Sequence, residues 1–168
     1  MPSIEDRNPM EVLMPNRTVH LAVGGVIGAA AAGVRAHIGA TEYVLPEALG
    51  GAVGGMIGAW LPDALDPPNH PHHRGIGHGC AALMGVGFFM VNSSATVDRL
   101  RSMAEKLRAQ AGALRPDDQL RAVLLDAVGL LALVLAGSIT GMGVGYASHL
   151  VMDGTTPKGL PLIGLADA

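Results

Sequence analysis

The sequence has a single cysteine, Cys80, among its 168 residues, and only 3% of its residues are aromatic. One cysteine excludes an intramolecular disulfide framework and any zinc site built from several thiolates, so a metal site would need histidine and carboxylate ligands. So few aromatic side chains make a poor composition for a water-soluble core of large residues.

Charged residues are also sparse, at 15% of the sequence, and the net charge is −3. No basic field is present to attract nucleic-acid phosphates, and we expect no specific nucleic-acid partner.

What the chain does have is apolar material, at 49% of its residues. Four apolar segments cover residues 19–34, 44–61, 79–97 and 122–152. Each is long enough, or nearly so, to cross a hydrocarbon layer of about 30 Å as a helix. We predict a polar N-terminal extension over residues 1–18 and a single helical membrane domain over 19–168. A compact soluble helical protein is the alternative, because Glu47 and Asp126 lie early in two of the segments.

Glycine decides between these alternatives. The chain has 24 glycines, and many recur four residues apart: Gly24 and Gly28, then Gly50, Gly54 and Gly58, then Gly137, Gly141 and Gly145. Glycines at this spacing share one helix face and let two backbones approach closely, which is typical of helix packing in membranes. In a soluble helix each would cost about 1 kcal/mol relative to alanine. The pattern favours the membrane, and such faces could also support an oligomer.

Residues 98–121 differ from the apolar segments on either side. Six basic residues alternate there with Met103, Leu107 and Leu114, and Arg115-Pro116-Asp117 is typical of a turn. We expect an additional amphipathic helix between segments three and four, either solvated or lying on an anionic leaflet. The predicted fold class is therefore all-α, a four-helix membrane bundle with this extra helix.

Histidines and carboxylates gather near the ends of the apolar segments. The loop after the second segment contains Asp63, Asp66, His70, His72, His73, Arg74 and His78, and the fourth segment ends with His149 and Asp153. Imidazole nitrogens and carboxylate oxygens are the ligands that zinc, manganese or iron accept when thiolates are absent. His149 and Asp153 are four residues apart and share one helix face. This pattern predicts a divalent-metal site.

Topology brings these residues together. If the four segments cross alternately, the start of the first, the end of the second, the start of the third and the end of the fourth lie on one side. The predicted metal ligands there are His20, Asp63, Asp66, His73, His78, His149 and Asp153. They exceed the needs of one tetrahedral ion, so two or more ions, or one ion and a general base, are both open. His37 lies at the opposite end, and His70 and His72 receive no role.

Four motifs in this set resemble a known family. They are Thr18-Val-His20, Leu61-Pro-Asp63-Ala-Leu-Asp66, His73-Arg74-Gly75-Ile-Gly-His78 and His149-Leu-Val-Met-Asp153-Gly. Together they resemble the LexA-regulated bacterial inner-membrane metal-dependent hydrolases of the YdjM type, which are distantly similar to zinc-dependent phospholipase C and single-strand zinc nucleases. The resemblance implies a multi-pass inner-membrane protein with zinc-dependent hydrolysis of phosphoesters, in which Asp66 is a ligand or a base.

The predicted function is a membrane-bound hydrolase that acts on a small phosphoester, phospholipid-like or nucleotide-like, through metal-activated water. Asp66 or Asp63 would accept a proton, and Arg74 would hold a phosphate oxygen or orient one of these two carboxylates. The alternative is a non-catalytic membrane module that binds metal for structure or transport. Membrane lipids are the expected partners. More basic residues lie on the side away from the site than beside it, which favours an extracytoplasmic site.

Overall fold

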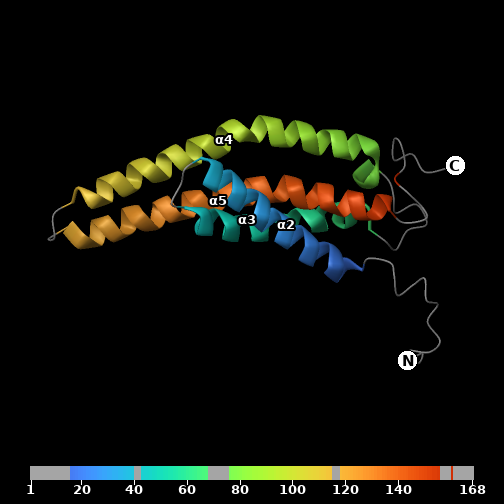
Figure 1. Ribbon diagram of the computed structural model, residues 1–168, viewed down its shortest axis with the longest axis horizontal. Helices are drawn as coiled ribbons and strands as arrows, with labels where there is room; N and C mark the ends of the chain where they lie inside the picture. Colours follow the sequence, from blue (N-terminus) through green and yellow to red (C-terminus); the bar gives the residue numbers. More distant parts are fainter. Residues whose placement is uncertain (1–15, 40–42, 68–75, 115–117, 156–159, 161–168) are drawn as a thin grey trace, which may run out of the picture.

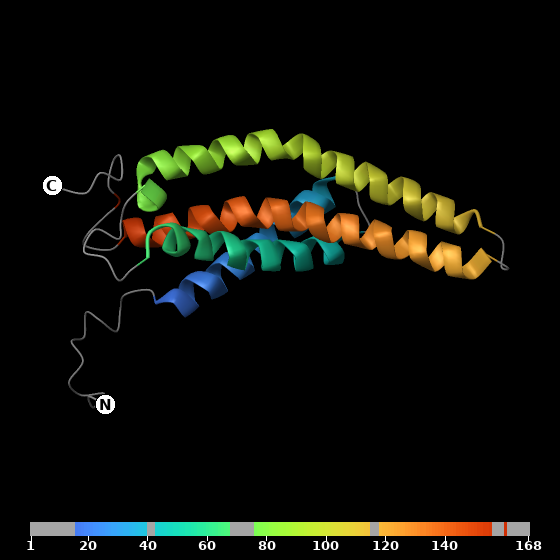
Figure 2. The same cartoon turned by 180° about the vertical axis from the view of Figure 1, so that it is seen from behind.

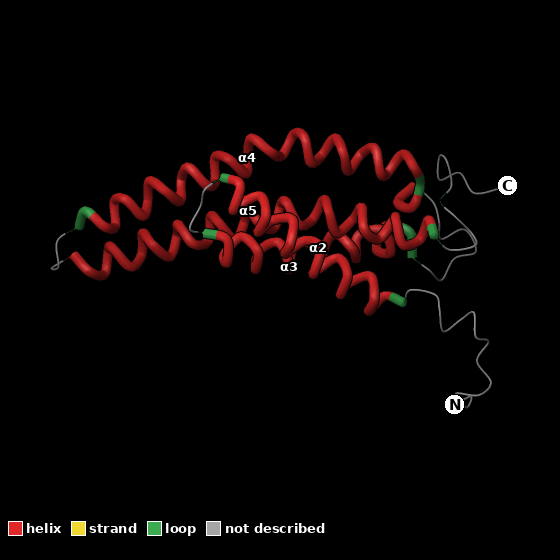
Figure 3. The backbone as a smooth tube through the Cα atoms, viewed as in Figure 1, coloured by secondary structure: helices red, strands yellow, loops and turns green. Residues whose placement is uncertain are grey.

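The computed structural model describes residues 16–39, 43–67, 76–114, 118–155 and 160. Within them all regular structure is helical (Figure 3). The elements are α2 (Arg17–Ile38), α3 (Val44–Leu65), the short 3-10 helix η2 (Ile76–His78), α4 (Cys80–Gly112) and α5 (Gln119–Gly154). All four α-helices are long and apolar enough to cross a membrane. The predicted all-α class with four potential spans is confirmed.

The prediction of an additional amphipathic helix is wrong for the residues that the structure describes. Residues 98–112 continue α4 without a break, and α5 already begins at Gln119. The reason is local: no glycine or proline separates the apolar part of α4 from its charged part, so nothing ends the helix there. The predicted turn at residues 115–117 lies outside the described residues.

The helices form a layered bundle around α5. This helix packs against α2, α3 and α4, and α2 packs across α3 (Figure 1). Helix α4 packs mainly along α5 on the outer side of the bundle, and its first half bows away from α5 in both views (Figure 2). Only 6% of the most apolar window of α4 is buried inside the protein, against 39% for α3. Helix α4 is therefore the peripheral helix of the bundle.

Glycine faces bring α2, α3 and α5 into backbone contact. A Cβ added at Gly54 would overlap the Ser138 carbonyl group of α5, and one added at Gly141 would overlap the Gly51 carbonyl group of α3. A Cβ added at Gly28 of α2 would overlap the same Gly51 carbonyl oxygen, so α2 also approaches α3 at this point. The repeated glycines thus pack helices within one chain, as small residues do in membranes.

Polar side chains join α4 to α2 and α3 at the bundle end where α2 finishes. Arg35 donates to Asp98 at 3.1 Å. Arg101 donates with Nε to Oε1 of Glu47 at 2.7 Å and with Nη2 to the other oxygen, and the Glu47 side chain is fully buried. A bidentate arginine–carboxylate pair satisfies both charges in an apolar setting. Glu47, which weakened the membrane interpretation of the sequence, is therefore neutralised by a partner on another helix.

Helices α4 and α5 are longer than the bundle. Their 33 and 36 residues correspond to about 50 and 54 Å, whereas the 22 residues of α2 or α3 span about 33 Å, close to a hydrocarbon core. The excess projects as a two-helix hairpin at the end where α2 finishes (Figure 1). Large apolar side chains such as Val26, Leu49, Phe88 and Leu131 stay exposed along the shared length. This outer surface suits contact with lipid tails.

Candidate metal centre

Four elements deliver ionisable side chains to the other end of the bundle. Helix α2 begins at its cap residue Asn16, whose side chain accepts from the Val19 backbone N–H at 3.0 Å, and His20 follows within the first turn. Asp63 lies in the last turn of α3 and His78 ends η2. His149 and Asp153 lie in the last turns of α5. The predicted alternation of the spans therefore produces a real convergence of side chains.

Four of these side chains form a closed ring of ligand atoms. His149 Nε2 lies 3.5 Å from Asp63 Oδ1 and 3.6 Å from Asp153 Oδ2. His78 Nε2 lies 3.6 Å from each of the same two oxygens. A tetrahedral zinc ion with bonds of about 2.0–2.1 Å would separate its ligand atoms by about 3.3 Å. These four separations lie within a few tenths of an ångström of that value, and the ligand atoms of Asp63, His78 and His149 are close enough together to hold one ion.

The hydrogen bonding of His149 leaves its Nε2 free to bind a cation at the centre of this ring. Its Nδ1 lies 2.6 Å from the carbonyl oxygen of Ala59, which can only accept, so Nδ1 must carry a proton. In a neutral ring Nε2 then presents a lone pair toward two carboxylate oxygens. Nε2 is buried and has no hydrogen-bond partner among the described residues. A metal ion would satisfy the lone pair and both carboxylates together.

Asp66 contacts His78 from outside the ring of ligand atoms and does not face the centre of that ring. Its Oδ2 accepts from the Gly77 backbone N–H at 2.7 Å and lies 3.3 Å from His78 Nδ1, the nitrogen that faces away from the ring. Burial lowers the pKa of His78, but hydrogen bonds with Asp63 and Asp66, together with the negative charges of Asp153 and Asp63, hold the pKa above its ordinary value. A carboxylate on the far nitrogen of a histidine is the usual outer partner of a metal ligand.

His20 meets the second oxygen of Asp153. Its Nε2 lies 3.5 Å from Asp153 Oδ1, and its ring stacks on His149 with centroids 3.9 Å apart. His20 Nδ1 is buried without a hydrogen-bond partner among the described residues. His20, His149 and Asp153 therefore form a second possible ligand group beside that of Asp63, His78 and His149. The carboxylate of Asp153 faces both groups, one oxygen to each.

Exposure differs around the centre. The side chains of His78 and His149 are 1% exposed, whereas that of Asp63 is 23% exposed. The centre therefore opens to its surroundings on the Asp63 side.

The structure places six of the predicted residues together: His20, Asp63, Asp66, His78, His149 and Asp153. The other two, His73 and Arg74, lie outside the described residues, as do His70 and His72. His37 is exposed near the far end of α2, away from the centre.

Two partners escaped the sequence prediction. The Ala59 carbonyl oxygen has no side-chain signature, so no pattern could have indicated it. Tyr146 donates its hydroxyl to the Gly77 carbonyl oxygen at 2.8 Å and thereby ties α5 to the segment that carries His78. Its position three residues before His149, on the same helix face, could have indicated that role.

Comparisons with known proteins agree with the membrane interpretation. No curated protein and no solved structure matches the chain. The family described as YdjM inner membrane protein matches residues 14–163, which include every described ligand of the centre. Together with four helices able to span a bilayer, this match supports a multi-pass membrane protein. The chain belongs to the YdjM inner membrane protein family.

Proposed function

We propose that this protein is a membrane-bound hydrolase that uses a divalent metal, zinc in the first place, to cleave a phosphoester. The observation that carries the proposal is the buried Nε2 of His149, which has no hydrogen-bond partner among the described residues and faces the carboxylates of Asp63 and Asp153. Gathering three carboxylates and three imidazoles at one end of a bundle costs desolvation free energy in an apolar protein. Ionisable groups within membrane-spanning proteins usually serve function.

Each residue has a distinct part in this proposal. His78, His149, Asp63 and Asp153 would hold the ion, and Asp66 keeps the His78 ring in position through Nδ1. When bound, the ion lowers the pKa of water and polarises a phosphoryl oxygen. Asp63 is the most exposed of the ring carboxylates, so it is the residue placed to accept a proton from an entering water. Arg74, which lies two residues before Ile76 of η2 in the sequence, supplies a guanidinium suited to phosphate.

The test is hydrolysis of bis(p-nitrophenyl) phosphate and of phospholipids in mixed micelles by purified protein supplied with zinc or manganese. Asp63→Asn is expected to lower kcat by at least about 100-fold, because it removes both a charged metal ligand and the proposed proton acceptor. Asp66→Asn keeps a hydrogen-bond partner for His78 but removes the negative charge of that partner. This variant is expected to weaken metal affinity by about 10–100-fold.

His37→Ala is the matched control, since this histidine is exposed and remote from the centre. It should leave both activity and metal content at the wild-type level. Metal-replete, folded wild-type protein without phosphoesterase activity on either substrate class would reject the hydrolase and leave a metal-binding module for structure or transport.

We further propose that the centre faces the extracytoplasmic side. Among the described residues, Arg35, Arg99, Arg101, Lys106, Arg108 and Arg121 lie toward the opposite end, against Arg17 near the centre. Basic residues concentrate on the cytoplasmic side of membrane proteins.

Labelling can test this orientation in a Cys80→Ser background. A membrane-impermeant maleimide added to intact spheroplasts is expected to label Thr155→Cys, just after α5, and to spare Gly112→Cys, at the tip of the hairpin. Both positions are exposed, so both should react after permeabilisation. Labelling of Gly112→Cys alone in intact spheroplasts would reverse the orientation.

A further inference from the structure

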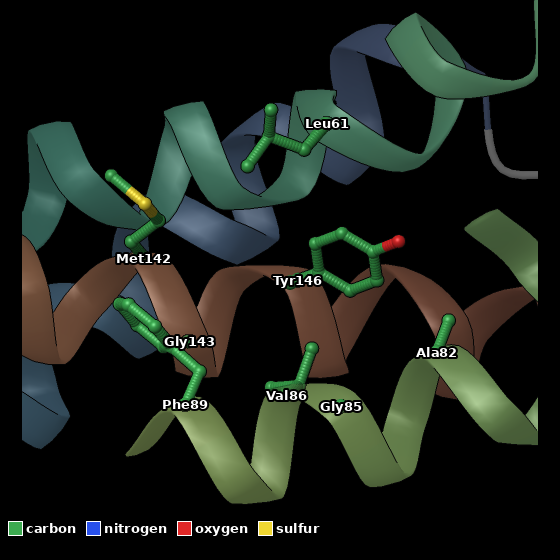
Figure 4. A pocket seen from close by; sticks show the side chains of 8 residues that line it. All are labelled: Leu61, Ala82, Gly85, Val86, Phe89, Met142, Gly143 and Tyr146. Atoms are coloured by element: carbon green, nitrogen blue, oxygen red, sulfur yellow. The ribbon is translucent and has the colours of Figure 1, made fainter. Parts of the chain in front are cut away.

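An apolar groove lies beside the metal centre, between α4 on one side and α3 and α5 on the other (Figure 4). Its volume is about 260 Å³. Phe89 of α4, Leu61 of α3, and Met142 and Tyr146 of α5 line it, and Gly85 of α4 leaves it open. We call this feature the chain groove.

The chain groove lies next to the metal centre. Leu61 lies two residues before Asp63, and Tyr146 lies three residues before His149. The Tyr146 hydroxyl donates to the carbonyl oxygen of Gly77, the neighbour of His78. The groove thus lies next to the residues that form the centre, and it covers residues 82–89 of α4 and 142–146 of α5.

The chain groove also lies at the depth of lipid tails. The buried residues of α4 are Val97, Ala104 and Ala111, all in its second half, so its first half stands clear of the bundle core. Neighbouring residues of that half, such as Met84 and Phe88, are 73% exposed. At this depth the surrounding solvent is hydrocarbon, and an apolar groove open to it takes a hydrocarbon chain rather than water.

We infer that the chain groove binds one hydrocarbon chain of the substrate, so that the substrate is a membrane lipid whose phosphoester group lies at the metal centre. That the bound lipid is a substrate rests on the proposed function. That the groove binds a hydrocarbon chain rests on the groove alone. It places the headgroup toward Asp63, the exposed side of the ring, and the tail between α4 and α5.

Two glycines of α4 provide a matched pair of variants. A Cβ at Gly85 or at Gly87 would meet no atom within 4 Å, so both accept a side chain without a clash. Only Gly85 lines the chain groove. Leucine at either position has the same helix propensity, so Gly85→Leu and Gly87→Leu differ mainly in filling the groove.

Photo-crosslinking tests the bound chain without requiring activity. Full-length protein is placed in vesicles of phosphatidylethanolamine and phosphatidylglycerol, with a fraction of the phosphatidylglycerol carrying a diazirine on one acyl chain. Crosslinks are expected at Met142 and Tyr146 behind α4, and also at the exposed Phe88, which contacts bulk lipid. Gly85→Leu should reduce the Met142 and Tyr146 crosslinks at least about tenfold and leave that at Phe88 unchanged, whereas Gly87→Leu should change none.

Hydrolysis then links the bound chain to the substrate. Gly85→Leu is expected to lower kcat/KM for two-chain phospholipid at least about tenfold and to leave bis(p-nitrophenyl) phosphate hydrolysis within about twofold of wild type. Equal loss on both substrates, or absence of Gly85-dependent crosslinks at Met142 and Tyr146, overturns the inference. Gly85-dependent crosslinks in a protein without phosphoesterase activity would instead retain the chain site and reject the hydrolase.

Discussion

Asp153→Asn is expected to abolish stable metal binding while the protein remains folded. Oδ2 of Asp153 faces the Nε2 atoms of His78 and His149, and Oδ1 faces His20, so this one carboxylate contacts three imidazoles. Asparagine keeps the shape but removes the charge that balances a divalent ion in an apolar setting. Since loss of an outer partner alone costs about 10–100-fold in affinity, loss of this ligand should cost more than about 100-fold.

Elemental analysis after dialysis, together with competition against a chromophoric chelator, measures this effect. Wild-type protein should retain at least one equivalent of zinc or manganese, and Asp153→Asn should retain close to none. His149→Ala should give the same result, and circular dichroism in detergent checks that both variants stay helical. A metal-free wild type under replete conditions, or an Asp153→Asn protein with unchanged affinity, would contradict the metal centre itself.

Gly54→Ala is expected to prevent correct assembly of the bundle. The added Cβ would overlap the carbonyl carbon, oxygen and Cα of Ser138, all backbone atoms that no rotamer change can move aside. Helices α3 and α5 would have to separate along a face that also brings Asp63 toward His149. Overpacking of this kind commonly costs about 1–3 kcal/mol, and a clash with backbone belongs at the upper end.

Gly33→Ala is the matched control for this effect. Gly33 is also a buried helix glycine, but its added Cβ would lie 3.6 Å from side-chain atoms of Val44 and Ala48, an ordinary contact. This variant should be neutral, or more stable by up to about 1 kcal/mol because alanine favours the helix. The yield of monodisperse protein and the thermal midpoint in detergent compare the two. Equal behaviour of both variants would mean that α3 and α5 are not in backbone contact.

Much of the architecture could be predicted from local patterns. Apolar length set the four spans, and alternate crossing placed His20, Asp63, His78 and His149 at one end because each lies near a span terminus. The continuity of α4 was missed because the change from apolar to charged residues after Val97 resembles a boundary, while helix ends depend on caps and breakers that this stretch lacks.

The division of labour between Asp63 and Asp66 could not be predicted, although both were identified. The two carboxylates are three residues apart, and a continuous helix would place them on one face. Helix α3 ends between them, and the non-helical backbone of Asp66, with φ −124° and ψ 80°, lets its side chain bond to Gly77 of η2. The pairing of Glu47 with Arg101 was equally invisible, because 54 residues separate the partners and only the packing of α4 joins them.

The buried pair of Glu47 and Arg101 also opposes sliding of α4 along the bundle. If α4 shifted along α5 by one helical turn, about 5.4 Å, Glu47 and Arg101 would each lose a charged partner inside an apolar layer. Arg101 lies 16 residues beyond Gly85 on the same helix, a rise of about 24 Å. An ion pair at the far end of the bundle therefore helps to fix the height of Gly85 and Phe89 opposite Met142 and Tyr146, and with it the position of the proposed lipid-tail groove relative to the candidate metal centre.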